Sequence, residues 1–444
     1  MEKVVVLGLG MSGLSACRFL LKKGYFILAC DDKLEAAKQK KEAAFLLEES
    51  HVALVSKDEC LTQLETIAFL VTSPGIFPTH PVLEQAKKLN VSIIGDVELA
   101  LRELSSLPPP MIGITGTNGK TTVTLLTQAM LQCQGYQTRA AGNIGLALLD
   151  EVEAVQREKS SNPLVVELSS FQLETMSTKL FQVGVVLNVT PDHLDYHGNM
   201  QEYLRAKMRL AGCIKEKEQG GILFVHEKVP VEKSPQIKRY GFSISSDVHT
   251  DGVSVIRYKE KEIELPEILQ SLFSHDVENF LAAYALAREL GVSPQSCVDA
   301  FCMFTKPPHR IQFVKEVAGV KYYDDSKGTN LDAVIRAVDS IPTKIVLIAG
   351  GVHKGEAYTS WLSAFHDKVQ QVFAIGEAAP LIEKDLAPKI PVKLCKTLDE
   401  AVAEASKIAR EGQTVLLSPG CSSFDMFKSY KERGEKFCQL VESL

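Results

Sequence analysis

A glycine-rich decapeptide, GITGTNGKTT at residues 113–122, carries the clearest chemical signal in the chain. It follows the apolar start of a strand and leads into the helical pattern VTLLTQAMLQ. A turn of this kind points backbone N–H groups inward at a helix N-terminus, where they bind phosphate. Lys120 can reach the β- and γ-phosphates of a nucleotide, and the Thr121 hydroxyl can ligate Mg²⁺. The segment therefore predicts a nucleoside triphosphate site.

The decapeptide departs from the standard phosphate loop, G-x-x-x-x-G-K-[ST], at its first position. That pattern would place its first glycine at Ile114, whereas the glycines here are Gly113, Gly116 and Gly119. The alternative interpretation is a chance glycine-rich turn with a lysine, and the strand–turn–helix context disfavours it. The departure itself argues against an ordinary GTPase or kinase.

A second nucleotide-type turn stands near the N-terminus, where Gly8, Gly10 and Gly13 spell G-x-G-x-x-G after an apolar strand. Asp31 and Asp32 follow the next strand, near the spacing at which an acid meets a ribose. By itself this pattern indicates NAD or FAD. Two other interpretations stay open: a tight turn without a ligand, and a turn that holds another diphosphate such as a UDP-sugar.

Two further features stand at the carboxyl ends of apolar strands, namely the SPG turn at residues 73–75 and Glu167. The ligands of α/β sheets bind at that end, and acids of the Walker-B type meet Mg²⁺ there. An isolated buried carboxylate is costly, so Glu167 must be paired or metal-bound. The alternative interpretation of SPG is a turn without a ligand. The alternative for Glu167 is a carboxylate that caps a helix or forms a salt bridge.

The loop NVTPDHLDYHG gathers Asp192, His193, Asp195 and His197 within six positions. Histidine and carboxylate can bind Mg²⁺ or Mn²⁺, but the spacing matches no zinc signature. We expect a functional role for His193, and we interpret Asp195 and His197 as polar groups of the loop.

The apolar runs that must position these residues predict an α/β protein. Runs of four to seven apolar residues between helical patterns indicate parallel sheets covered on both faces. Strands are expected at 3–9, 26–32, 51–56, 66–75, 91–96, 163–168, 182–190, 320–326, 344–351, 371–377 and 414–420, with further strands of a sheet edge at 220–225, 238–243, 253–258 and 262–266. Helices are expected at 12–24, 123–132, 277–291, 331–341 and 398–411, and a charged helix is expected after residue 32. The proline stretch at 105–110 is a plausible linker.

Length and composition set broad limits. A chain of 444 residues suggests about three domains, and 45% hydrophobic with 23% charged residues is ordinary for a globular protein. The net charge of -6 gives no sign of a nucleic-acid or membrane partner. Ten cysteines without a C-x-x-C pair favour a reducing compartment. The N-terminal run before Cys17 resembles a short signal, but Glu2 and the nucleotide-type glycines disfavour it, so we expect a cytoplasmic protein.

The order of the motifs resembles the Mur ligase family, the ATP-dependent amide-forming enzymes of peptidoglycan synthesis. The motifs are GITGTNGKTT, GNIG at 142–145, VVELSSFQLE, NVTPDHLDYHG, RAKMR around Lys207, PPHR, DDSKGTN and LSPGCSSFD. The resemblance covers all three segments. It implies a UDP-substrate-binding Rossmann-like domain at 1–94, a central ATP-binding P-loop domain with a mostly parallel sheet at 95–305, and an amino-acid-binding Rossmann-like domain at 306–444.

Within this family, the chain looks most like the ligases that join D-glutamate to UDP-N-acetylmuramoyl-L-alanine. The N-terminal G-x-G-x-x-G, the SPG turn, DDSKGTN before an apolar helix and SPGCSSFDMFKSYKERG carry this likeness. The DNPR-type signature of the diaminopimelate-adding ligases is absent from the sequence. The resemblance implies ATP, two Mg²⁺ ions, the two small-molecule substrates, no nucleic-acid or membrane partner, and a monomer.

The resemblance also assigns roles to individual positions. Catalytic roles fall to Lys120, Glu167, His193, Lys207 and Arg310, and metal ligation falls to Thr121, Glu167, His193 and Lys207. The resemblance assigns ATP contacts to Gly116, Thr117, Asn118, Gly119, Lys120, Thr121, Thr122, Asn279, Arg310 and Asp325. His309 and Arg310, together with Asp325 and Lys327, match the third-domain contacts to ATP and the reacting phosphate. The resemblance assigns binding of the UDP-substrate to Gly10, Ser12, Gly13, Asp31, Asp32, Ser73, Pro74, Gly75 and Asn143. It assigns binding of D-glutamate to Lys327, Thr329, Lys354, Ser418 and Phe427.

Several of these positions have a plain alternative. By sequence alone Lys207 is a surface lysine, whereas the resemblance makes it a carbamylated lysine whose anion helps to hold the second Mg²⁺. Lys354, Thr329, Ser418 and Phe427 read equally as a surface lysine, a helix cap, a turn serine and a core phenylalanine.

One motif departs from the family pattern. The adenine-side H-N-x-x-N reads HDVEN, so Asp276 replaces the first asparagine and Asn279 keeps the second. An aspartate accepts hydrogen bonds but lacks the amide donors. The last motif reads GCS where ACA is commoner, which is a milder change.

Four interpretations of function therefore stand side by side. The first is D-glutamate ligation through an acyl phosphate. Another amino-acid or folyl-type ligase of the same family keeps the chemistry and changes the substrate. An NAD-dependent oxidoreductase would use the N-terminal turn, but it leaves the phosphate loop and DDSKGTN unexplained. A non-catalytic nucleotide sensor would bind ATP without amino-acid-dependent phosphate release.

Overall fold

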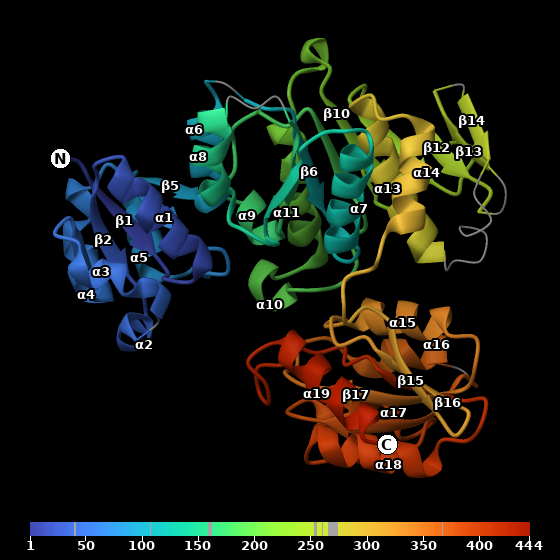
Figure 1. Ribbon diagram of the computed structural model, residues 1–444. Coiled ribbons are helices and arrows are strands. Elements are labelled where there is room, and N and C mark those ends of the chain that lie inside the picture. Colours follow the sequence, from blue (N-terminus) through green and yellow to red (C-terminus); the bar gives the residue numbers. More distant parts are fainter. Residues whose placement is uncertain are drawn as a thin grey trace. The chain divides into compact units, whose positions relative to one another are not determined.

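The computed structural model describes residues 1–39, 41–106, 108–158, 162–252, 255–259, 261–264, 274–365 and 367–444. Residue 107 of the expected linker, and residues 253, 254, 265 and 266 of the expected edge strands, lie outside this description. Three sheets are present, each with helices on both faces (Figure 1). The α/β class with mostly parallel sheets is thereby confirmed.

The chain divides into two compact units. The first unit contains Met1–Val189 and Leu204–Phe304, and the second contains Thr190–Tyr203 and Thr305–Leu444. The first two sheets belong to the first unit and the third sheet to the second unit.

The first sheet has five parallel strands in the order β3-β2-β1-β4-β5. They are β1 (Lys3–Leu7), β2 (Phe26–Cys30), β3 (Val52–Val55), β4 (Phe69–Thr72) and β5 (Ser92–Gly95). The helices are α1 (Met11–Lys22), α2 (Leu34–Lys38), α3 (Phe45–Glu48), α4 (Lys57–Gln63), α5 (Pro81–Lys88) and α6 (Asp96–Leu104). Val4 and Val6 of β1 join one core cluster while Val5 and Leu7 join another. A parallel strand buried on both faces reads as such a continuous apolar run.

The charged segment after residue 32 does not form the predicted single helix. The structure has α2, a 3₁₀ turn at Lys41–Ala43 and α3 instead. Ala37, Ala43 and Leu46 are all buried in the same core cluster. At 3.6 residues per turn, one continuous helix would place Ala37 on the face opposite Ala43 and Leu46. The chain must therefore turn between them.

Helices α4, α5 and α6 were not predicted, although α4 and α5 carry start signals in the sequence. Ser56 and Glu59 form a capping box at α4, and Pro81 occupies the first turn of α5. Both signals satisfy or remove backbone donors that a helix N-terminus leaves unpaired.

The second sheet has nine strands in the order β14-β13-β12-β11-β10-β9-β6-β8-β7. They are β6 (Met111–Thr115), β7 (Arg139–Gly142), β8 (Leu164–Glu167), β9 (Val183–Val186), β10 (Ile222–His226), β11 (Ile237–Gly241), β12 (Val248–Thr250), β13 (Val255–Tyr258) and β14 (Lys261–Glu264). All pairs are parallel except those of β13, which runs antiparallel to β12 and β14. The expected edge strands are present within the described residues.

Helices cover both faces of this second sheet. They are α7 (Lys120–Cys133), α8 (Leu148–Glu158), α9 (Ser170–Leu173), α11 (Met200–Cys213), α13 (Ser274–Glu289) and α14 (Pro294–Met303). Val165 of β8 packs in the cluster with α7, α13 and α14, while Val166 packs in the cluster with α8 and α11. Strand β6 lies between β9 and β8, so the loop that follows it has a neighbouring strand on each side.

The third sheet has six strands in the order β15-β16-β20-β17-β18-β19, and only β15 is antiparallel. They are β15 (Gln312–Val317), β16 (Val320–Asp324), β17 (Ile345–Gly350), β18 (Val369–Ile375), β19 (Val392–Leu394) and β20 (Thr414–Leu417). The helices are α15 (Leu331–Ser340), α16 (Trp361–Phe365), α17 (Ala379–Leu386), α18 (Leu398–Ile408) and α19 (Tyr430–Glu442). The short α10 (Leu194–His197) also belongs to the second unit.

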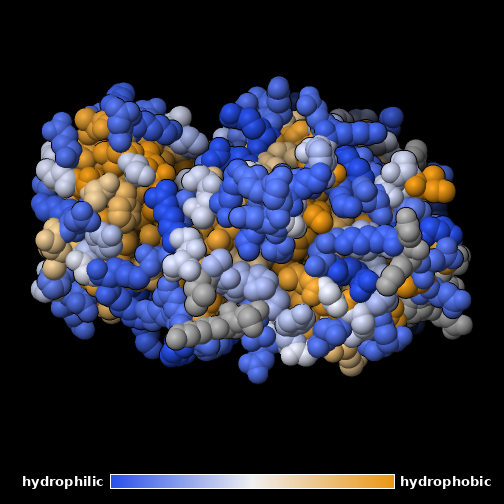
Figure 2. Space-filling view, turned by 90° about the horizontal axis from the view of Figure 1, so that it is seen from above, coloured by the Kyte–Doolittle hydropathy of each residue, from blue (hydrophilic) through white to orange (hydrophobic). Residues whose placement is uncertain are grey.

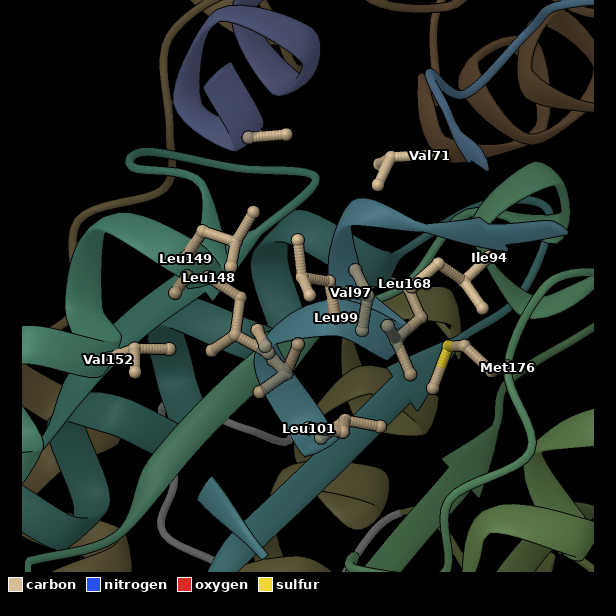
Figure 3. Close-up of a cluster of buried hydrophobic side chains, with 14 of the residues drawn as sticks. Val71, Ile94, Val97, Leu99, Leu101, Leu148, Leu149, Val152, Leu168 and Met176 are labelled. Atoms are coloured by element: carbon tan, nitrogen blue, oxygen red, sulfur yellow. The ribbon is translucent and has the colours of Figure 1, made fainter. Parts of the chain in front are cut away.

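Within the first unit, α6 and α8 pack the first two sheets into one continuous core. Figure 3 shows side chains of α6, such as Val97 and Leu99, beside Leu148 and Leu149 of α8. Gly95, the N-cap of α6, lies against the segment that follows α9, where a Cβ atom would collide with the Thr175 hydroxyl.

A buried carboxylate, Glu98 of α6, fixes the same junction. Its oxygens accept hydrogen bonds from Ser177 N at 2.8 Å, Ser177 Oγ at 3.0 Å, Thr178 N at 3.1 Å and Thr178 Oγ1 at 2.8 Å. Arg102 Nε donates a further bond at 2.9 Å. Burial opposes ionisation, but these donors outweigh it, and the pKa of Glu98 lies below its ordinary value. The charged form therefore stabilises the junction.

The surface in the view of Figure 2 is mostly hydrophilic, with hydrophobic residues gathered in smaller areas. Among the described residues, no helix has both the length and the apolar character needed to cross a bilayer.

We predict that Glu98→Gln destabilises the first unit by about 1.5–3 kcal/mol at pH 7, the range for hydrogen bonds to a charged group. Urea unfolding followed by circular dichroism would measure this. Because the folded-state pKa is depressed, the stabilisation is complete above the ordinary value of 4.5 and is lost as pH falls through the folded-state pKa. The difference between variant and wild type should therefore disappear in acid.

The matched control is Glu103→Gln on the same helix, which removes a partly exposed ion pair with Lys23. Surface pairs contribute about 0–1 kcal/mol. A Glu98→Gln protein as stable as wild type at pH 7 would contradict the assignment.

Candidate functional site

The phosphate loop lies between β6 and α7, at the carboxyl edge of the second sheet. Gly116 has φ +158° and Gly119, the N-cap of α7, has φ +86°. A Cβ atom at Gly116 would lie 2.8 Å from Leu187 Cβ, and one at Gly119 would lie 2.5 Å from Asn279 Oδ1. Close packing against Leu187 favours glycine at position 116, and the left-handed backbone conformation favours it at position 119. Gly113 instead lies inside β6, where Leu210 and Phe181 leave no room for a side chain.

Asn188, for which the sequence predicted no role, fixes the conformation of the phosphate loop. Thr117 N donates to Asn188 O at 2.9 Å, and Asn118 N donates to Asn188 Oδ1 at 2.8 Å. Asn188 Nδ2 donates back to Asn118 O at 3.0 Å. The loop is therefore braced from the strand beside it, while the first turn of α7 supplies N–H groups that lack acceptors within a helix.

Two lysines converge on one carbonyl of the loop. Lys120 Nζ donates to Gly116 O at 2.8 Å and to Thr117 O at 2.7 Å. Lys207 Nζ, from α11, donates to the same Gly116 O at 2.8 Å. Only 1% of Lys207 is exposed, so its interpretation as a surface lysine is wrong. A buried ammonium is costly unless it is paired, and a lysine side chain is almost never fully buried without a partner.

Glu167 ends β8 beside this loop and carries an unsatisfied oxygen. Its Oε1 accepts from Asn143 Nδ2 at 3.0 Å, and its backbone oxygen accepts from Asn143 N at 2.9 Å. Its Oε2 is buried and has no hydrogen-bond partner among the described residues. Buried polar atoms are nearly always satisfied, so an orphaned carboxylate oxygen fits a metal ligand.

The side-chain oxygens of Glu167 and Thr121 suit Mg²⁺ that also binds nucleotide phosphates, and not a metal ion that is bound by protein ligands alone. The described residues contain no cluster of three or more histidines, cysteines and carboxylates that could hold an ion. Mg²⁺ commonly binds one or two carboxylates together with substrate phosphates and water. Thr121, at the start of α7, is half-buried and follows Lys120 directly.

The HDVEN motif, for which the family resemblance implies an adenine contact, lies on α13. Asn279 lies close to the phosphate loop: a Cβ atom at Gly119 would be 2.5 Å from its Oδ1. Asp276, the departure from the family pattern, is buried, and its Oδ1 lies 3.5 Å from His275 Nε2. The structure thus brings Asn279 to the nucleotide loop, where an ATP contact was predicted for it.

The N-terminal turn is braced by two of its predicted ligand residues. Asp31 Oδ2 accepts from Leu9 N at 2.6 Å, and Ser73 Oγ donates to Gly8 O at 2.7 Å. A Cβ atom at Gly13, in the first turn of α1, would collide with the Gly8 carbonyl oxygen, so only glycine fits at this position. Asp32 Oδ1 lies 3.2 Å from His80 Nε2.

The remaining members of this predicted group, Gly10, Ser12, Pro74 and Gly75, lie in the same two turns, at the carboxyl edge of the first sheet. A side chain at Gly10 or Gly75 would meet nothing within 4 Å.

The loop that carries His193 belongs to the second unit. His193 has φ +53° and starts α10, an uncommon conformation for a non-glycine residue. The neighbouring Asp192 forms an ion pair with Lys354 Nζ at 2.9 Å and accepts from Asn330 Nδ2 at 3.2 Å. Burial opposes the charge of Asp192, but the charges of Lys354 and His193 outweigh it and lower its pKa.

Asp325 lies at the carboxyl end of β16, and Ser418 follows β20. The Ser418 hydroxyl donates to Asp325 Oδ2 at 2.7 Å, and Ile311 N donates to Oδ1 at 3.3 Å. Burial raises the pKa of Asp325 to about 7, while the Ser418 bond and the Arg310 charge oppose the rise. Ser418 is fully buried, so any contact with D-glutamate would need the residues that cover it to move.

The other predicted D-glutamate residues have mixed surroundings. The Lys327 ammonium lies 3.9 Å from the centre of the Tyr430 ring. Thr329 is half-buried just before Asn330, the N-cap of α15. Phe427 packs against the core of the third sheet, which matches its plain alternative. The roles of all these residues in binding stay predictions.

The loop that carries Arg310 has a strained backbone. His309 and Ile311, on either side of it, have φ +64° and +47°. Left-handed conformations of this kind cost about 1–3 kcal/mol each and persist only where the surroundings impose them. The His309 ring is buried, and its Nδ1 lies 2.6 Å from Asp324 Oδ2.

Arg433 of α19 ties three loops of this sheet edge together. Its guanidinium donates to Ser326 Oγ at 3.0 Å, Ser326 O at 2.9 Å, Cys421 O at 3.2 Å and Gly350 O at 3.5 Å. These acceptors lie at or after the ends of β16, β20 and β17. Burial lowers the pKa of Arg433 to about 10. Sequence reasoning assigned no role to this residue, because its partners lie far apart along the chain.

Comparison with known families gives three matches along the chain. Residues 2–95 match the N-terminal domain of MurD-like Mur ligases, residues 114–287 the Mur ligase middle domain, and residues 309–421 the glutamate ligase domain of Mur ligases.

Similar proteins and structures agree with this. The UDP-N-acetylmuramoylalanine–D-glutamate ligase of Protochlamydia amoebophila is 42% identical over 449 residues, which cover 100% of this chain and 98% of that protein. The enzyme of the same name from Chlamydia pneumoniae is 36% identical, with 100% and 99% covered. The crystal structure of UDP-N-acetylmuramate-alanine ligase from Thermotoga maritima has a TM-score of 0.60 and covers 100% of both chains; at 16% identity it is similar in fold.

Proposed function

Because the chain belongs to the Mur ligase family, we propose that it joins D-glutamate to UDP-N-acetylmuramoyl-L-alanine at the expense of ATP. The substrate assignment is supported by the full-length likeness to ligases of that name. The observation that carries the chemistry is the phosphate loop, where Lys120 and the buried Lys207 meet at the Gly116 carbonyl.

The proposed reaction must first activate a carboxylate, which is a poor electrophile. A carboxylate oxygen of the UDP-substrate attacks the γ-phosphorus of ATP, the bond to the β-phosphate oxygen breaks, and ADP leaves. The amine of D-glutamate then attacks the acyl carbon of the acyl phosphate. The resulting tetrahedral intermediate expels phosphate, the nitrogen loses a proton, and the amide remains.

The phosphate loop supplies the electrostatic part of this reaction. We assign Gly116, Thr117, Asn118, Gly119, Thr121, Thr122, Asn279 and Asp325 to ATP binding. Preorganised positive charge at the transferring phosphoryl group is usually the main contribution to such catalysis. Lys120, held by two loop carbonyls, and Arg310 are the residues proposed to provide it.

Two Mg²⁺ ions are proposed to accompany ATP, and when bound they neutralise phosphate charge. Thr121, Glu167, His193 and Lys207 would hold them, and the unsatisfied Glu167 oxygen is the feature that supports this. Lys207 would take part as a carbamate: its neutral amine adds to CO₂ and releases a proton. The carbamate replaces a cation by an anion at a buried position, which suits a metal site.

The substrate residues follow the same division. Asn143 and the two N-terminal turns are proposed to bind the UDP-substrate, through Gly10, Ser12, Gly13, Asp31, Asp32, Ser73, Pro74 and Gly75. Lys327, Thr329, Lys354, Ser418 and Phe427 are proposed for D-glutamate. Lys354 is paired with Asp192, so a substrate carboxylate would have to share or displace that partner.

We place the domain boundaries at 94/95 and 305/306, close to the limits of the matched family domains. We also propose a cytoplasmic monomer with small-molecule substrates and without nucleic-acid or membrane partners. The net charge of -6 supports the absence of a polyanionic partner.

The proposal is tested by phosphate release from ATP with UDP-N-acetylmuramoyl-L-alanine and a panel of amino acids. We expect stimulation by D-glutamate and none by L-glutamate, D-aspartate, L-lysine or diaminopimelate. Stimulation by a different amino acid would assign another ligase activity. ATP binding without any amino-acid-dependent release would favour a nucleotide sensor.

We predict that Lys120→Ala lowers kcat by at least ~100-fold, as for the loss of one preorganised charge stabiliser. Steady-state phosphate release would measure it. Lys179→Ala is the matched control, because Lys179 is an exposed lysine paired at the surface with Glu216. A Lys120→Ala enzyme with near wild-type release would remove the loop from the proposed ATP site.

We predict that Lys207→Ala is inactive and regains part of its activity when small carboxylic acids such as acetate are added, because these restore the missing anion. Chloride at equal ionic strength serves as the control. Full activity of Lys207→Ala without additives would eliminate the carbamate.

A further inference from the structure

We propose that Asp324 and His309 are positioning residues that hold Arg310 in place, with Asp324 acting through His309 and not on a substrate. The inference rests on the proposed function, because Arg310 is the residue assigned there to the reacting phosphate. It gives a role to the first carboxylate of DDSKGTN, which the family resemblance left without one.

The backbone around Arg310 has a shape that its surroundings must impose. Its two neighbours, His309 and Ile311, both occupy the left-handed region, at φ +64° and +47°. For Ile311 this is a genuine outlier, since a β-branched side chain disfavours it. Two left-handed residues on either side of Arg310 set the direction in which the Arg310 side chain projects from the loop.

The Asp324–His309 pair is the first of the contacts that impose this shape. Asp324 is 0% exposed; its Oδ2 lies 2.6 Å from His309 Nδ1 and its Oδ1 accepts from Ser326 N at 2.8 Å. A carboxylate buried to this extent cannot reach a substrate directly. It can act only through the groups that it holds.

The neighbouring helix α19 is shaped around the pair. Gly434 lies on that helix in a helical conformation, where alanine would normally be preferred. A Cβ atom at this position would collide with His309 Nδ1 and lie 2.8 Å from Asp324 Oδ2. The glycine therefore makes room for the pair, independently of the loop's own contacts.

The backbone groups next to Arg310 are anchored as well. His309 N donates to Gln312 Oε1 at 3.0 Å, and Lys327 N donates to His309 O at 3.1 Å. Ile311 N donates to Asp325 Oδ1 at 3.3 Å. Both peptide neighbours of Arg310 are thus fixed to the two carboxylates of the motif and to its backbone. A misplaced Arg310 would miss the phosphate by a distance that catalysis does not tolerate.

The test is a double-mutant cycle that combines Asp324→Ala with Arg310→Ala, measured as D-glutamate-dependent phosphate release. We expect Asp324→Ala to lower kcat about 100-fold in the wild-type background and to leave the KM for ATP within about twofold of its wild-type value. The reason is that a misplaced Arg310 weakens binding of the transition state but not of the bound substrate. In the Arg310→Ala background the same change should lower kcat less than about threefold.

Conservative rescue separates positioning from folding. The substitution Asp324→Asn keeps an oxygen that can accept from Ser326 N and adds an amide that can donate to the other tautomer of His309, so most of the activity should return. Gly434→Ala, which displaces the pair without changing it chemically, should resemble Asp324→Ala.

The matched control is Cys438→Ala. The Cys438 thiol lies 3.5 Å from the same Asp324 oxygen. A thiol is a weak donor, and its removal leaves the 2.6 Å contact between Asp324 and His309 in place, so kcat should not change. If Asp324→Ala does not fold, His309→Ala takes its place in the cycle.

The possible outcomes distinguish this inference from the proposed function. Wild-type protein that releases no phosphate with D-glutamate would refute the proposed function. A fully active Arg310→Ala enzyme, or an equal loss from Asp324→Ala in both backgrounds, would overturn the positioning role while the proposed reaction stands.

Discussion

The carbonyl oxygen of Gly116 accepts hydrogen bonds from the side-chain nitrogens of two lysines, and the shape of the phosphate loop depends on this contact. A glycine-rich loop exposes backbone carbonyls as well as N–H groups, and each buried one needs a partner. Lys120 comes from the helix that the loop starts, whereas Lys207 must reach the same atom from α11. Asn188 completes the loop from the segment that follows β9. The cradle is thus preorganised by three separate segments before any phosphate binds.

The same physical solution recurs at the carboxyl edges of the other two sheets. Asp31 and Ser73 brace the N-terminal turn through backbone groups of the residues that follow β1. Arg433 braces the turns after β16, β17 and β20. Parallel strands present their carboxyl ends together, so their loops crowd at one edge and share polar partners. A ligand at such an edge meets groups whose positions are already determined by one another.

Much of the architecture could be predicted from the sequence because its signals are local. The apolar runs of β1, β8, β17 and β20 are long enough to be recognised as buried strands, and the phosphate loop shows its turn and helix directly. The prediction for the segment after residue 32 was wrong because its composition favours a helix while Ala37, Ala43 and Leu46 must enter one core. Burial of those three side chains overrides the local preference.

The sequence by itself determined the chemistry that is carried by neighbouring residues: the phosphate loop, the acid that ends β8 and the paired carboxylates of DDSKGTN. Only the tertiary structure decided which distant groups complete them. It buried Lys207 beside Gly116, paired Asp192 with Lys354 and placed His309 against Asp324. The physical reason is that desolvation and charge pairing depend on which segments pack together. Residue type and spacing show what a side chain can do, and the packed environment decides what it must do.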